Sequence, residues 1–398
     1  MNQYPTIDNI DLANKKVLLR ADLNVPLKGF EKSYRVQRLL PTIEELIKRG
    51  SSVVIISHYG RPKGFEGIEG KHSLKKILKN LSNVTNKTIK FGEDCISENT
   101  KKKIKDLKPG EIILLENTRF YKEEKDNVDQ FAKKLSEHMD IYINDAFSCA
   151  HRAHASNHGI VKYLPSFIGR MMEHELSRLN NMIVKPQRPI LTIIGGAKIS
   201  SKIPLFENLL KTMDKIFIAG GMANTFLEAQ GYSTKKSLFE KGMENKVKEI
   251  FSKAEENNCK IILPIDAAVA SEPREDANNK IESIKSIPDN QMILDIGPKT
   301  IVKIEEEILC SKTIVWNGPL GVYEVEPFNK GTKKIGETIS KLTREGKITS
   351  LIGGGDTASA LQDYSFYKDF SYISTGGGAF LEWLEGKELP GLKILKKL

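Results

Sequence analysis

The repeating unit that decides the fold lies in residues 41–61, Pro-Thr-Ile-Glu-Glu-Leu-Ile-Lys-Arg-Gly-Ser-Ser-Val-Val-Ile-Ile-Ser-His-Tyr-Gly-Arg. The first ten residues are amphipathic, and Pro41 suits a first helical turn while Gly50 suits a helix stop. Val53–Ile56 is then a continuous apolar run, typical of a strand that is buried on both faces. A polar loop follows. A helix, a buried strand and a polar loop in this order predict an α/β domain with a parallel sheet.

Similar β-branched, apolar runs recur along the chain and are separated by amphipathic stretches. They are Val17–Leu19, Ile112–Leu115, Ile141–Ile143, Ile190–Ile194, Ile216–Ala219, Ile261–Leu263, Met292–Leu294, Thr313–Trp316, Leu351–Ile352 and Tyr372–Ile373. Near the middle, Arg170–Lys185 has a polar, helical pattern that ends before Pro186 and Pro189, and we interpret it as an interdomain helix. The sequence therefore predicts two halves of similar size, each with its own sheet.

The composition places the chain among ordinary globular proteins. It has 398 residues, of which 39% are hydrophobic and 28% charged, which fits two or three domains and excludes a disordered or fibrous chain. The sequence has no apolar run of about 18 residues and no secretory pattern, so we expect a cytoplasmic protein. The four cysteines, Cys95, Cys149, Cys259 and Cys310, are far apart, which predicts a reducing compartment and no structural metal.

The net charge of +10 lies mainly in the N-terminal half, and its distribution is informative. Arginine accounts for the difference, because its planar guanidinium group binds carboxylate and phosphate through two hydrogen bonds. Nine arginines precede residue 187 and three follow it. The lysine-rich stretch Lys101–Lys105 is interpreted as a solvated surface. The N-terminal half is thus expected to bind a small anion.

Polar residues directly after the strands predict where this anion binds. In open α/β sheets, ligands bind beyond the carboxyl ends of the strands. Several arginines and a histidine can neutralise a phosphate and a carboxylate together, while Asp22 and Asn24 can accept hydroxyl hydrogens. The candidate residues of this half are Asp22, Asn24, Arg35, His58, Arg61, Arg119 and Arg152.

The C-terminal half has glycine-rich loops after its strands, where backbone amides can approach phosphate oxygens. In Gly195–Lys202, Lys198 and Lys202 stand four residues apart, so on a helix they share a face and can grip a polyphosphate. In Gly353–Thr357, Asp356 is the candidate ligand for magnesium carried by a nucleotide. This half is thus expected to bind a magnesium nucleotide.

Two other nucleotide-binding classes fit the sequence poorly. It contains no GxxxxGK[ST] motif, so it is not a P-loop enzyme. Gly353–Ala358 matches the weak GxGxxA form of a dinucleotide fingerprint, but Ser374 and Thr375 stand where an acid for the ribose is expected. An anionic acceptor and a nucleotide together point to phosphoryl transfer. If the acceptor is a carboxylate, no general base is required, and His58 is then a ligand rather than a base.

Eight motifs in these loops resemble the phosphoglycerate kinase family over essentially the whole chain. They are Val17–Pro26, Ser57–Pro62, Leu114–Phe120, Asn144–Phe147, Ala150–His154, Asp295–Thr300, Trp316–Val322 and Leu384–Gly391. The resemblance implies reversible, magnesium-dependent phosphoryl transfer from 1,3-bisphosphoglycerate to ADP, giving 3-phosphoglycerate and ATP in glycolysis and gluconeogenesis. Such an enzyme is a phosphotransferase with a carboxyl group as acceptor, and a monomer.

The same resemblance implies an α/β fold of two Rossmann-like, three-layer αβα domains with parallel sheets, joined by a hinge helix. Residues 1–170 are expected to form the 3-phosphoglycerate-binding domain and residues 189–380 the nucleotide-binding domain. Residues 171–188 are expected to form the hinge, and residues 381–398 a tail that returns to the N-terminal domain.

The resemblance also assigns residues to ligands. Phosphoglycerate is expected at Asp22, Leu23, Asn24, Arg35, His58, Tyr59, Gly60, Arg61, Arg119 and Arg152. The nucleotide is expected at Lys198, Lys202, Asn317, Glu324, Gly354, Gly355, Asp356 and Thr357, with magnesium at Asp356. The catalytic group comprises Arg35, Lys198, Gly354 and Gly377.

Several positions depart from the commonest form of the family without changing the charged ligands. Ser148-Cys149 replaces Gly-Thr, Tyr59 replaces a leucine, Ala379-Phe380 replaces Ala-Ser, and Lys28–Tyr34 lacks an acidic stretch. Two alternatives of other classes remain open at this point. One is a nucleic-acid binder that uses the +10 charge, although aromatic residues make up only 7% of the chain. The other is a nicotinamide dehydrogenase.

Overall fold

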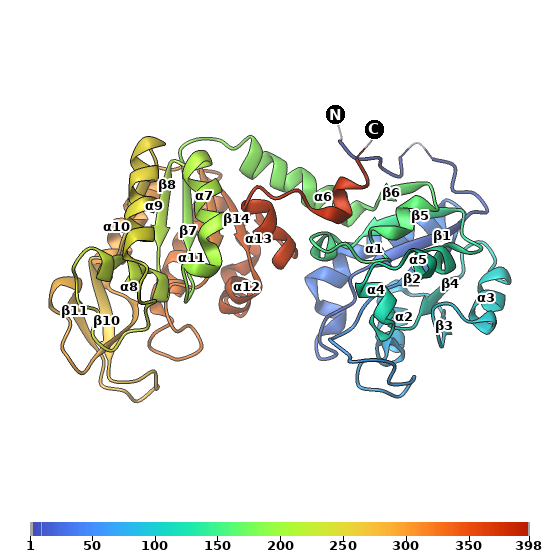
Figure 1. Ribbon diagram of the computed structural model, residues 1–398, viewed down its shortest axis with the longest axis horizontal. Helices are drawn as coiled ribbons and strands as arrows, with labels where there is room; N and C mark the ends of the chain where they lie inside the picture. The colour runs from blue at the N-terminus through green and yellow to red at the C-terminus, as the bar shows by residue number, and fades with distance from the viewer. Residues whose placement is uncertain (1–2, 9, 397–398) are drawn as a thin grey trace. The chain divides into compact units, whose positions relative to one another are not determined.

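The computed structural model describes residues 3–8 and 10–396, and the chain forms two compact units. The N-terminal unit comprises the chain up to Ser177 together with the segment from Glu388 onward, and the C-terminal unit comprises Arg178–Lys387. Each unit is built on a six-stranded parallel sheet with helices on both faces (Figure 1). This architecture confirms the predicted α/β fold class. The predicted domain boundaries at residues 170, 188 and 380 stay predictions.

The sheet of the N-terminal unit has the strand order β3-β4-β2-β1-β5-β6, and all its pairs are parallel. Its strands are β1 (Lys16–Ala21), β2 (Ser52–Ile56), β3 (Ile89–Gly92), β4 (Ile112–Leu115), β5 (Ile141–Asp145) and β6 (Ser166–Ile168). Its helices are α1 (Tyr34–Lys48), α2 (Leu78–Thr85), α3 (Glu98–Lys105), α4 (Lys122–Lys125), α5 (Asp129–Ser136), most of α6 (Arg170–Leu179) and α14 (Pro390–Lys393).

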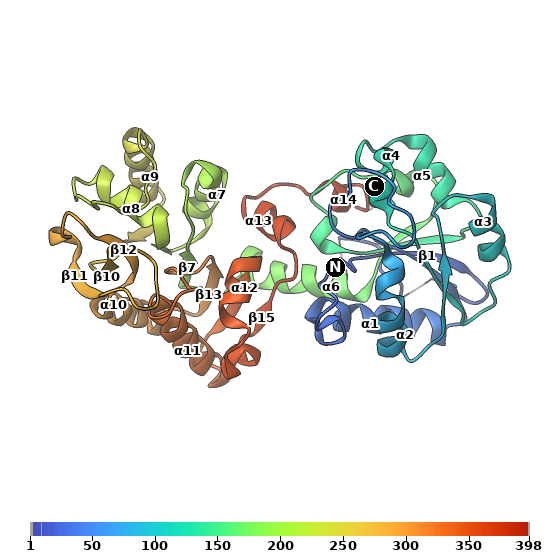
Figure 2. The ribbon, with the colours of Figure 1, turned by 90° about the horizontal axis from the view of Figure 1, so that it is seen from below.

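Alternate residues of these strands form two separate hydrophobic cores. Leu19 and Ile55 belong to the core on the side of α1 and α2, whereas Leu18 and Val54 belong to the core that includes residues of α3 and α5. Figure 2 shows α1 and α2 on one side of this unit and α4 and α5 on the other. Because both faces are covered, the central positions of these strands are apolar on both sides of the sheet, which explains the continuous runs in the sequence.

The C-terminal unit has two sheets, one parallel and one antiparallel. The parallel sheet has the order β15-β14-β13-β7-β8-β9, and the three-stranded antiparallel sheet has the order β11-β10-β12. Its strands are β7 (Ile190–Ile194), β8 (Lys215–Ile218), β9 (Lys260–Ile262), β10 (Asp266–Ala270), β11 (Lys280–Ser283), β12 (Met292–Ile296), β13 (Thr313–Asn317), β14 (Thr349–Gly353) and β15 (Tyr372–Ile373). Its helices are α7 (Ile203–Thr212), α8 (Gly220–Ala229), α9 (Glu244–Glu256), α10 (Pro298–Leu309), α11 (Lys330–Arg344), α12 (Gly355–Leu361) and α13 (Gly378–Leu384).

Every apolar run named in the sequence coincides with a strand, although Ala219 and Leu263 lie one residue beyond β8 and β9. The start of the first helix differs from the prediction. Helix α1 begins at Tyr34, so Pro41 lies inside it rather than in its first turn. Val36 and Leu39 continue the buried face of Ile43 toward the N-terminus at helical spacing, and their burial stabilises a helix that includes the proline. The predicted stop is correct, because Gly50 has φ of 81° and the helix ends just before it.

The antiparallel sheet is a feature that the sequence did not predict. Met292–Leu294 was expected in a parallel sheet, yet β12 pairs antiparallel with β10. Strand β10, Asp-Ala-Ala-Val-Ala, is buried but carries small side chains, and β11, Lys-Ile-Glu-Ser, is largely exposed. Neither strand has the bulky, continuous apolar pattern that marks a buried parallel strand.

The stretch interpreted as an interdomain helix is helical in the structure. Helix α6 (Arg170–Leu179) continues as a π-helical turn over Asn180–Val184. In the part of the chain that the structure describes, no helix is long and apolar enough to cross a membrane.

Candidate functional site

Polar residues gather at the carboxyl ends of four neighbouring strands in the N-terminal unit. Of the predicted phosphoglycerate residues, Asp22 follows β1, His58 follows β2 and Arg119 lies in the turn after β4. Ser148, which was not predicted as a ligand, follows β5. These strands are adjacent in the order β4-β2-β1-β5, so their loops meet at one edge of the sheet. We call this cluster the anion site.

Asp22 is the acidic centre of the anion site and is 3% exposed. Its carboxylate accepts hydrogen bonds from the backbone N–H of Asn24 at 3.0 Å and from the Ser148 hydroxyl, and it pairs with Arg35 Nη1 at 2.9 Å. Burial alone would raise the pKa of Asp22, but the charge of Arg35 and the hydrogen bond from Ser148 oppose it, and the pKa is lowered. Asp22 is therefore an ionised acceptor that orients Arg35.

The loop after β2 is held by amide side chains from two neighbouring loops. Asn24 Oδ1 accepts the Gly60 N–H at 2.8 Å, and Arg119 Nη1 donates to the Gly60 carbonyl at 2.7 Å. Asn117 accepts the Tyr59 N–H at 3.1 Å and donates to the Tyr59 carbonyl at 2.7 Å. Gly60 has φ of 60°, and a Cβ there would lie 2.2 Å from the His72 ring, so only glycine fits this turn.

His58 is nearly enclosed, with 5% of its surface exposed. Burial lowers its pKa well below the usual value, and the charges of Arg20, Arg119 and Arg35 lower it further, while Asp22 opposes them. The ring is therefore neutral near pH 7. Its Nδ1 lies 3.2 Å from Arg20 Nη2.

The anion site contains three potential metal ligands, but its geometry suits an anion. Ligand atoms of Asp22, His58 and Cys149 lie within 4.8 Å of one another. The Asp22 carboxylate already faces Arg35, and both His58 Nδ1 and Cys149 Sγ face Arg20 Nη2. A cation would have to displace two guanidinium groups, so this cluster is not assigned as a metal site.

The structure places most of the predicted residues together. Asp22, Leu23, Asn24, Arg35, His58, Tyr59, Gly60 and Arg119 are linked through the contacts above and through the bond from Leu23 N–H to Ser57 Oγ. Arg61 follows Gly60 and is exposed. Arg152 is exposed as well and donates to His151 Nε2 at 3.1 Å. The pKa of Arg119 is lowered mainly by burial, and the nearby charge of Arg152 contributes to this shift.

Sequence reasoning missed several polar residues of the anion site. They are Arg20, Ser57, Asn117, Ser148 and Cys149, of which the last two were noted only as departures from the family. Arg20 carried a usable signal, because an arginine inside an apolar strand needs buried partners. Asn117 showed a weaker one, because it directly follows the apolar run of β4.

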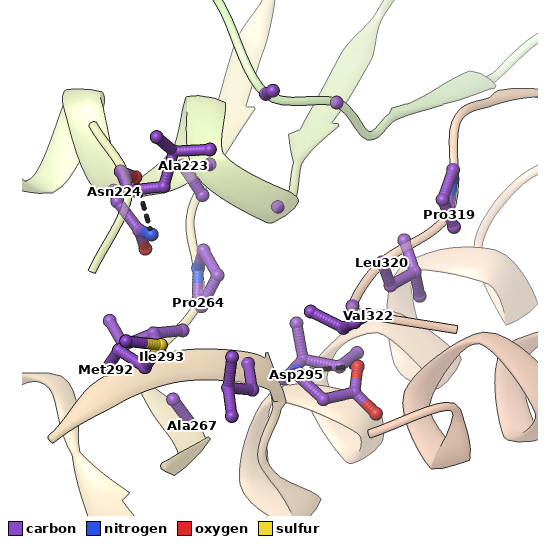
Figure 3. A pocket seen from close by; sticks show the side chains of 18 of the residues that line it. Ala223, Asn224, Pro264, Ala267, Met292, Ile293, Asp295, Pro319, Leu320 and Val322 are labelled. Carbon is purple, nitrogen blue, oxygen red and sulfur yellow. Dashed lines mark hydrogen bonds between the residues drawn. The ribbon is translucent and has the colours of Figure 1, made fainter. Parts of the chain in front are cut away.

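The C-terminal unit contains a cavity of about 390 Å³ at the carboxyl ends of its central strands. Gly196, Gly220, Pro319 and Asp356, which follow β7, β8, β13 and β14, all line it. Figure 3 shows Ala223 and Asn224 on one wall and Leu320 and Val322 on another, with Met292 and Ile293 nearby. Its size and largely apolar lining suit a flat ring system, and its glycine edge suits phosphates.

The sequence indicated the glycine edge of the cavity but not its apolar wall. Gly220-Gly221 also follows a strand, but no role was assigned to it from the sequence. The wall residues that sequence reasoning missed include Ala223, Asn224, Leu227, Leu238, Met292, Leu294 and Val322. They come from helices and loops far apart in the sequence, and apolar side chains carry no chemical signal of their own.

Lys202 and Asn317 form the polar centre beside this cavity. Lys202 Nζ donates to Asn317 Oδ1 at 2.7 Å, and Asn317 Nδ2 donates to the Gly353 carbonyl at 2.9 Å. Burial lowers the pKa of Lys202, and the charge of Asp356 partly opposes this shift. Asn317 thus ties Lys202 to the glycine loop before α12.

The glycine loop exposes backbone amides at the start of α12. Gly354 has φ of 92°, and a Cβ there would lie 2.6 Å from Asn317 Nδ2, so the loop requires glycine. Thr357 Oγ1 donates to the Gly353 carbonyl at 2.8 Å and accepts the Gly318 N–H at 2.6 Å. The space around Gly355 is open, and Asp356 is exposed along the cavity. An exposed carboxylate beside open amides fits a magnesium ion bound together with phosphates.

The remaining predicted residues of this unit are Lys198, Glu324 and Gly377. Lys198 is exposed after Ala197, which lines the cavity, and Glu324 is exposed on its wall. Gly377 has φ of 52° and precedes α13, with open space around it. Phe380, one of the departures, is buried, and a Cβ on Gly353 would lie 1.9 Å from its ring. Phe380 therefore packs against the backbone of Gly353.

Two α/β units, one with an arginine-rich anion site and the other with a glycine-edged cavity, define the chain as a kinase of the two-unit α/β class. Comparison with known proteins gives the family. A sequence model described as phosphoglycerate kinase matches residues 7–387. The chain belongs to the phosphoglycerate kinase family.

Individual relatives agree over the full length. The chain is 46% identical to the phosphoglycerate kinase of Methylorubrum populi, covering 100% of this chain and 99% of the relative. It is 47% identical to that of Sinorhizobium medicae, covering 99% of each. Solved structures from Coxiella burnetii and Pyrococcus horikoshii superpose with TM-scores of 0.88 and 0.81, at 40% and 32% identity and 98% coverage of both chains.

The family establishes the reaction. The enzyme transfers a phosphoryl group between 1,3-bisphosphoglycerate and ADP, giving 3-phosphoglycerate and ATP in glycolysis. The nucleic-acid binder and the nicotinamide dehydrogenase that the sequence left open are thereby excluded as its main function.

Proposed function

We propose that the anion site of the N-terminal unit holds 3-phosphoglycerate. The observation that carries this proposal is the ionised Asp22 carboxylate, which holds Arg35 at 2.9 Å in a loop cluster that also contains Arg119 and His58. Arg35, Arg61, Arg119 and Arg152 supply charge for the phosphate and the carboxylate. Asp22 and Asn24 accept the hydroxyl hydrogen, and the backbone of Leu23, Tyr59 and Gly60 shapes the loops.

The C-terminal cavity binds the nucleotide in this proposal. Its apolar wall takes the base, and exposed Glu324 takes the ribose hydroxyls. The amides of Gly354, Gly355 and Thr357 receive phosphate oxygens, together with Lys202 held by Asn317. Asp356 would hold magnesium, which supplies positive charge to the nucleotide phosphates.

Catalysis then rests on positioning and charge neutralisation. The acceptor is a carboxylate, so no proton has to be removed. Arg35, Lys198 and the backbone of Gly354 and Gly377 would surround the transferring phosphoryl group. Reacting atoms must come within about 3–3.5 Å in surroundings that exclude water. We therefore propose a hinge motion along the chain near α6, in a monomeric and cytoplasmic enzyme.

Methyl NMR on the full chain tests the assignment of one ligand to each unit. 3-Phosphoglycerate alone should shift the methyl resonances of Leu23, whereas ADP with magnesium should shift those of Leu227, Leu238 and Met292. Ile308, buried in the C-terminal core away from the cavity lining, is the control resonance. Shifts of Leu238 on adding 3-phosphoglycerate alone would contradict the assignment.

Size and motion are tested separately. Sedimentation should give the mass of one chain. Small-angle scattering should show a smaller radius of gyration only when both ligands are present, and an unchanged radius in all samples would contradict the hinge.

A further inference from the structure

Arg20 is a charged residue near the carboxyl end of strand β1, and only 1% of its surface is exposed. A buried charge is tolerated only when its donors are satisfied. Arg20 Nε donates to Ser156 Oγ at 2.9 Å, Nη1 donates to the Ala21 carbonyl, and Nη2 lies 3.2 Å from His58 Nδ1. The guanidinium group thus has a fixed orientation, with one edge against the histidine of the anion site.

A buried acid anchors the other edge of Arg20. Glu124 is fully buried and accepts two hydrogen bonds from Ser156, from the hydroxyl at 2.6 Å and from the backbone N–H at 2.9 Å. Ser156 Oγ therefore points its hydrogen at Glu124 and its lone pairs at Arg20. Glu124, Ser156, Arg20 and His58 thus form a continuous chain of buried hydrogen bonds. Ser156 donates to Glu124, and Arg20 donates both to Ser156 and toward His58.

The chemistry of arginine decides the state of the ring that it faces. A guanidinium group has five N–H donors and no acceptor. His58 Nδ1 must therefore accept with its lone pair, and in a neutral ring the proton is then on Nε2. The charged groups that face His58 are Asp22, Arg20, Arg119 and Arg35, and the Cys149 thiol lies 3.7 Å from Nδ1. Three of the four charges are positive and disfavour a second proton on the ring.

We infer that Arg20 is a positioning residue that fixes His58 as its neutral Nε2–H tautomer, so that His58 presents an N–H donor to the anionic substrate. In this state His58 cannot act as a base. The role toward substrate rests on the proposed binding of 3-phosphoglycerate at the anion site, whereas the tautomer is a property of the free protein. The low pKa of His58 agrees with it.

The tautomer is measured directly by nitrogen NMR of the full chain labelled with ¹⁵N-histidine. His58→Gln assigns its signals among the seven histidines. We expect an unprotonated Nδ1 and a protonated Nε2 from about pH 5.5 to 8. A proton on Nδ1, or protonation of the ring within this range, would overturn the inference.

Arg20→Lys tests the positioning, because lysine keeps a positive charge near Glu124 but cannot contact Ser156 and His58 together. We expect a mixture of His58 tautomers and a KM for 3-phosphoglycerate raised about tenfold, the scale of one hydrogen bond, with an unchanged KM for the nucleotide. Tyr142→Phe is the matched control, because it removes a buried hydroxyl that donates to the Ser156 carbonyl at 2.8 Å and leaves the pair intact. Equal effects of the two substitutions on the tautomer would refute a specific role of Arg20.

Two further measurements keep the outcomes distinct. If Arg20→Lys does not fold, Ser156→Ala can replace it, because it removes the hydroxyl that joins Arg20 to Glu124. This variant should also give a mixture of His58 tautomers. If free His58 has the expected tautomer but 3-phosphoglycerate does not shift its Nε2–H signal, the positioning stands and the proposed substrate site is wrong.

Discussion

Asn317→Ala is expected to weaken nucleotide binding because it releases Lys202. The Asn317 side chain is buried, accepts from Lys202 Nζ at 2.7 Å and donates to the Gly353 carbonyl at 2.9 Å. Alanine removes both bonds. The Gly353 carbonyl still accepts from the Thr357 hydroxyl at 2.8 Å, so the glycine loop retains one partner. In the part of the chain that the structure describes, Asn317 is the one hydrogen-bond partner of the Lys202 ammonium.

The size of the effect follows from these two bonds. A hydrogen bond to a charged group contributes about 1.5–3 kcal/mol, and a neutral one about 1 kcal/mol, so the variant should lose roughly 3 kcal/mol of unfolding free energy. A free lysine side chain must also be ordered when phosphate binds, at a cost of about 1.5–2 kcal/mol. That cost corresponds to a Kd for ADP raised about 10- to 30-fold.

Titration calorimetry with magnesium ADP measures the affinity, and urea unfolding measures the stability. Asn208→Ala is the matched control, because Asn208 lies in the same unit and donates to the Leu384 carbonyl at 2.7 Å away from the cavity lining. It should change stability but leave the ADP affinity unchanged. An unchanged ADP affinity in Asn317→Ala would refute the argument that Asn317 orients Lys202.

Three further predictions concern turnover, substrate binding and pH. Lys198→Ala should lower kcat by two to three decades, about 3 kcal/mol, with little change in ADP affinity; a loss of affinity alone would contradict its proposed role. Arg119→Ala should weaken 3-phosphoglycerate binding and its salt dependence but not ADP binding, as calorimetry on each ligand can show. Burial raises the pKa of Asp145 to about 7, so the folded chain holds a proton that the unfolded chain releases, and stability falls as pH rises from about 4 to 7. Asp145→Asn should reduce this pH-dependent loss of unfolding free energy, measured by urea unfolding, by up to about 4 kcal/mol. If the unfolding free energies of the variant and the parent chain change with pH in parallel, the prediction is wrong.

The parallel framework of the fold was predictable because buried strands have a simple pattern. All the apolar runs coincide with strands to within one residue, and the loops that follow several of them carry the polar residues of the anion site. The antiparallel strands β10 and β11 were not predictable in the same way. Their side chains are small or exposed, and their pairing depends on contacts with β12 rather than on local pattern.

The sites were predictable only where a residue has a chemical signature. Arginine, histidine and aspartate at strand ends pointed to the anion site, and glycine with lysine pointed to the cavity. Residues that hold these groups in place carry a weaker signal. Asn117 resembles any polar loop residue in the sequence, and Asn317 was expected only through the family resemblance, yet the structure gives each of them hydrogen bonds that fix a neighbouring segment.

Aspartate–glycine pairs show why strand-end motifs alone do not separate binding residues from structural ones. Three buried aspartates accept backbone N–H groups in the first turns of α6, α10 and α11, where such donors lack partners within the helix. Each packs against a glycine at that helix start, and a Cβ there would lie 2.4 or 2.5 Å from the carboxyl group. The pairs are Asp145 with Gly169, Asp266 with Gly297, and Asp295 with Gly331. The partners in these hydrogen bonds are 27, 34 and 36 residues apart in the sequence. The pairings therefore cannot be predicted from local sequence, because the folded sheet brings the partners together. An aspartate at the end of a strand therefore indicates a ligand site only when, as for Asp22, it also pairs with a charged side chain, here Arg35, rather than accepting from uncharged donors alone.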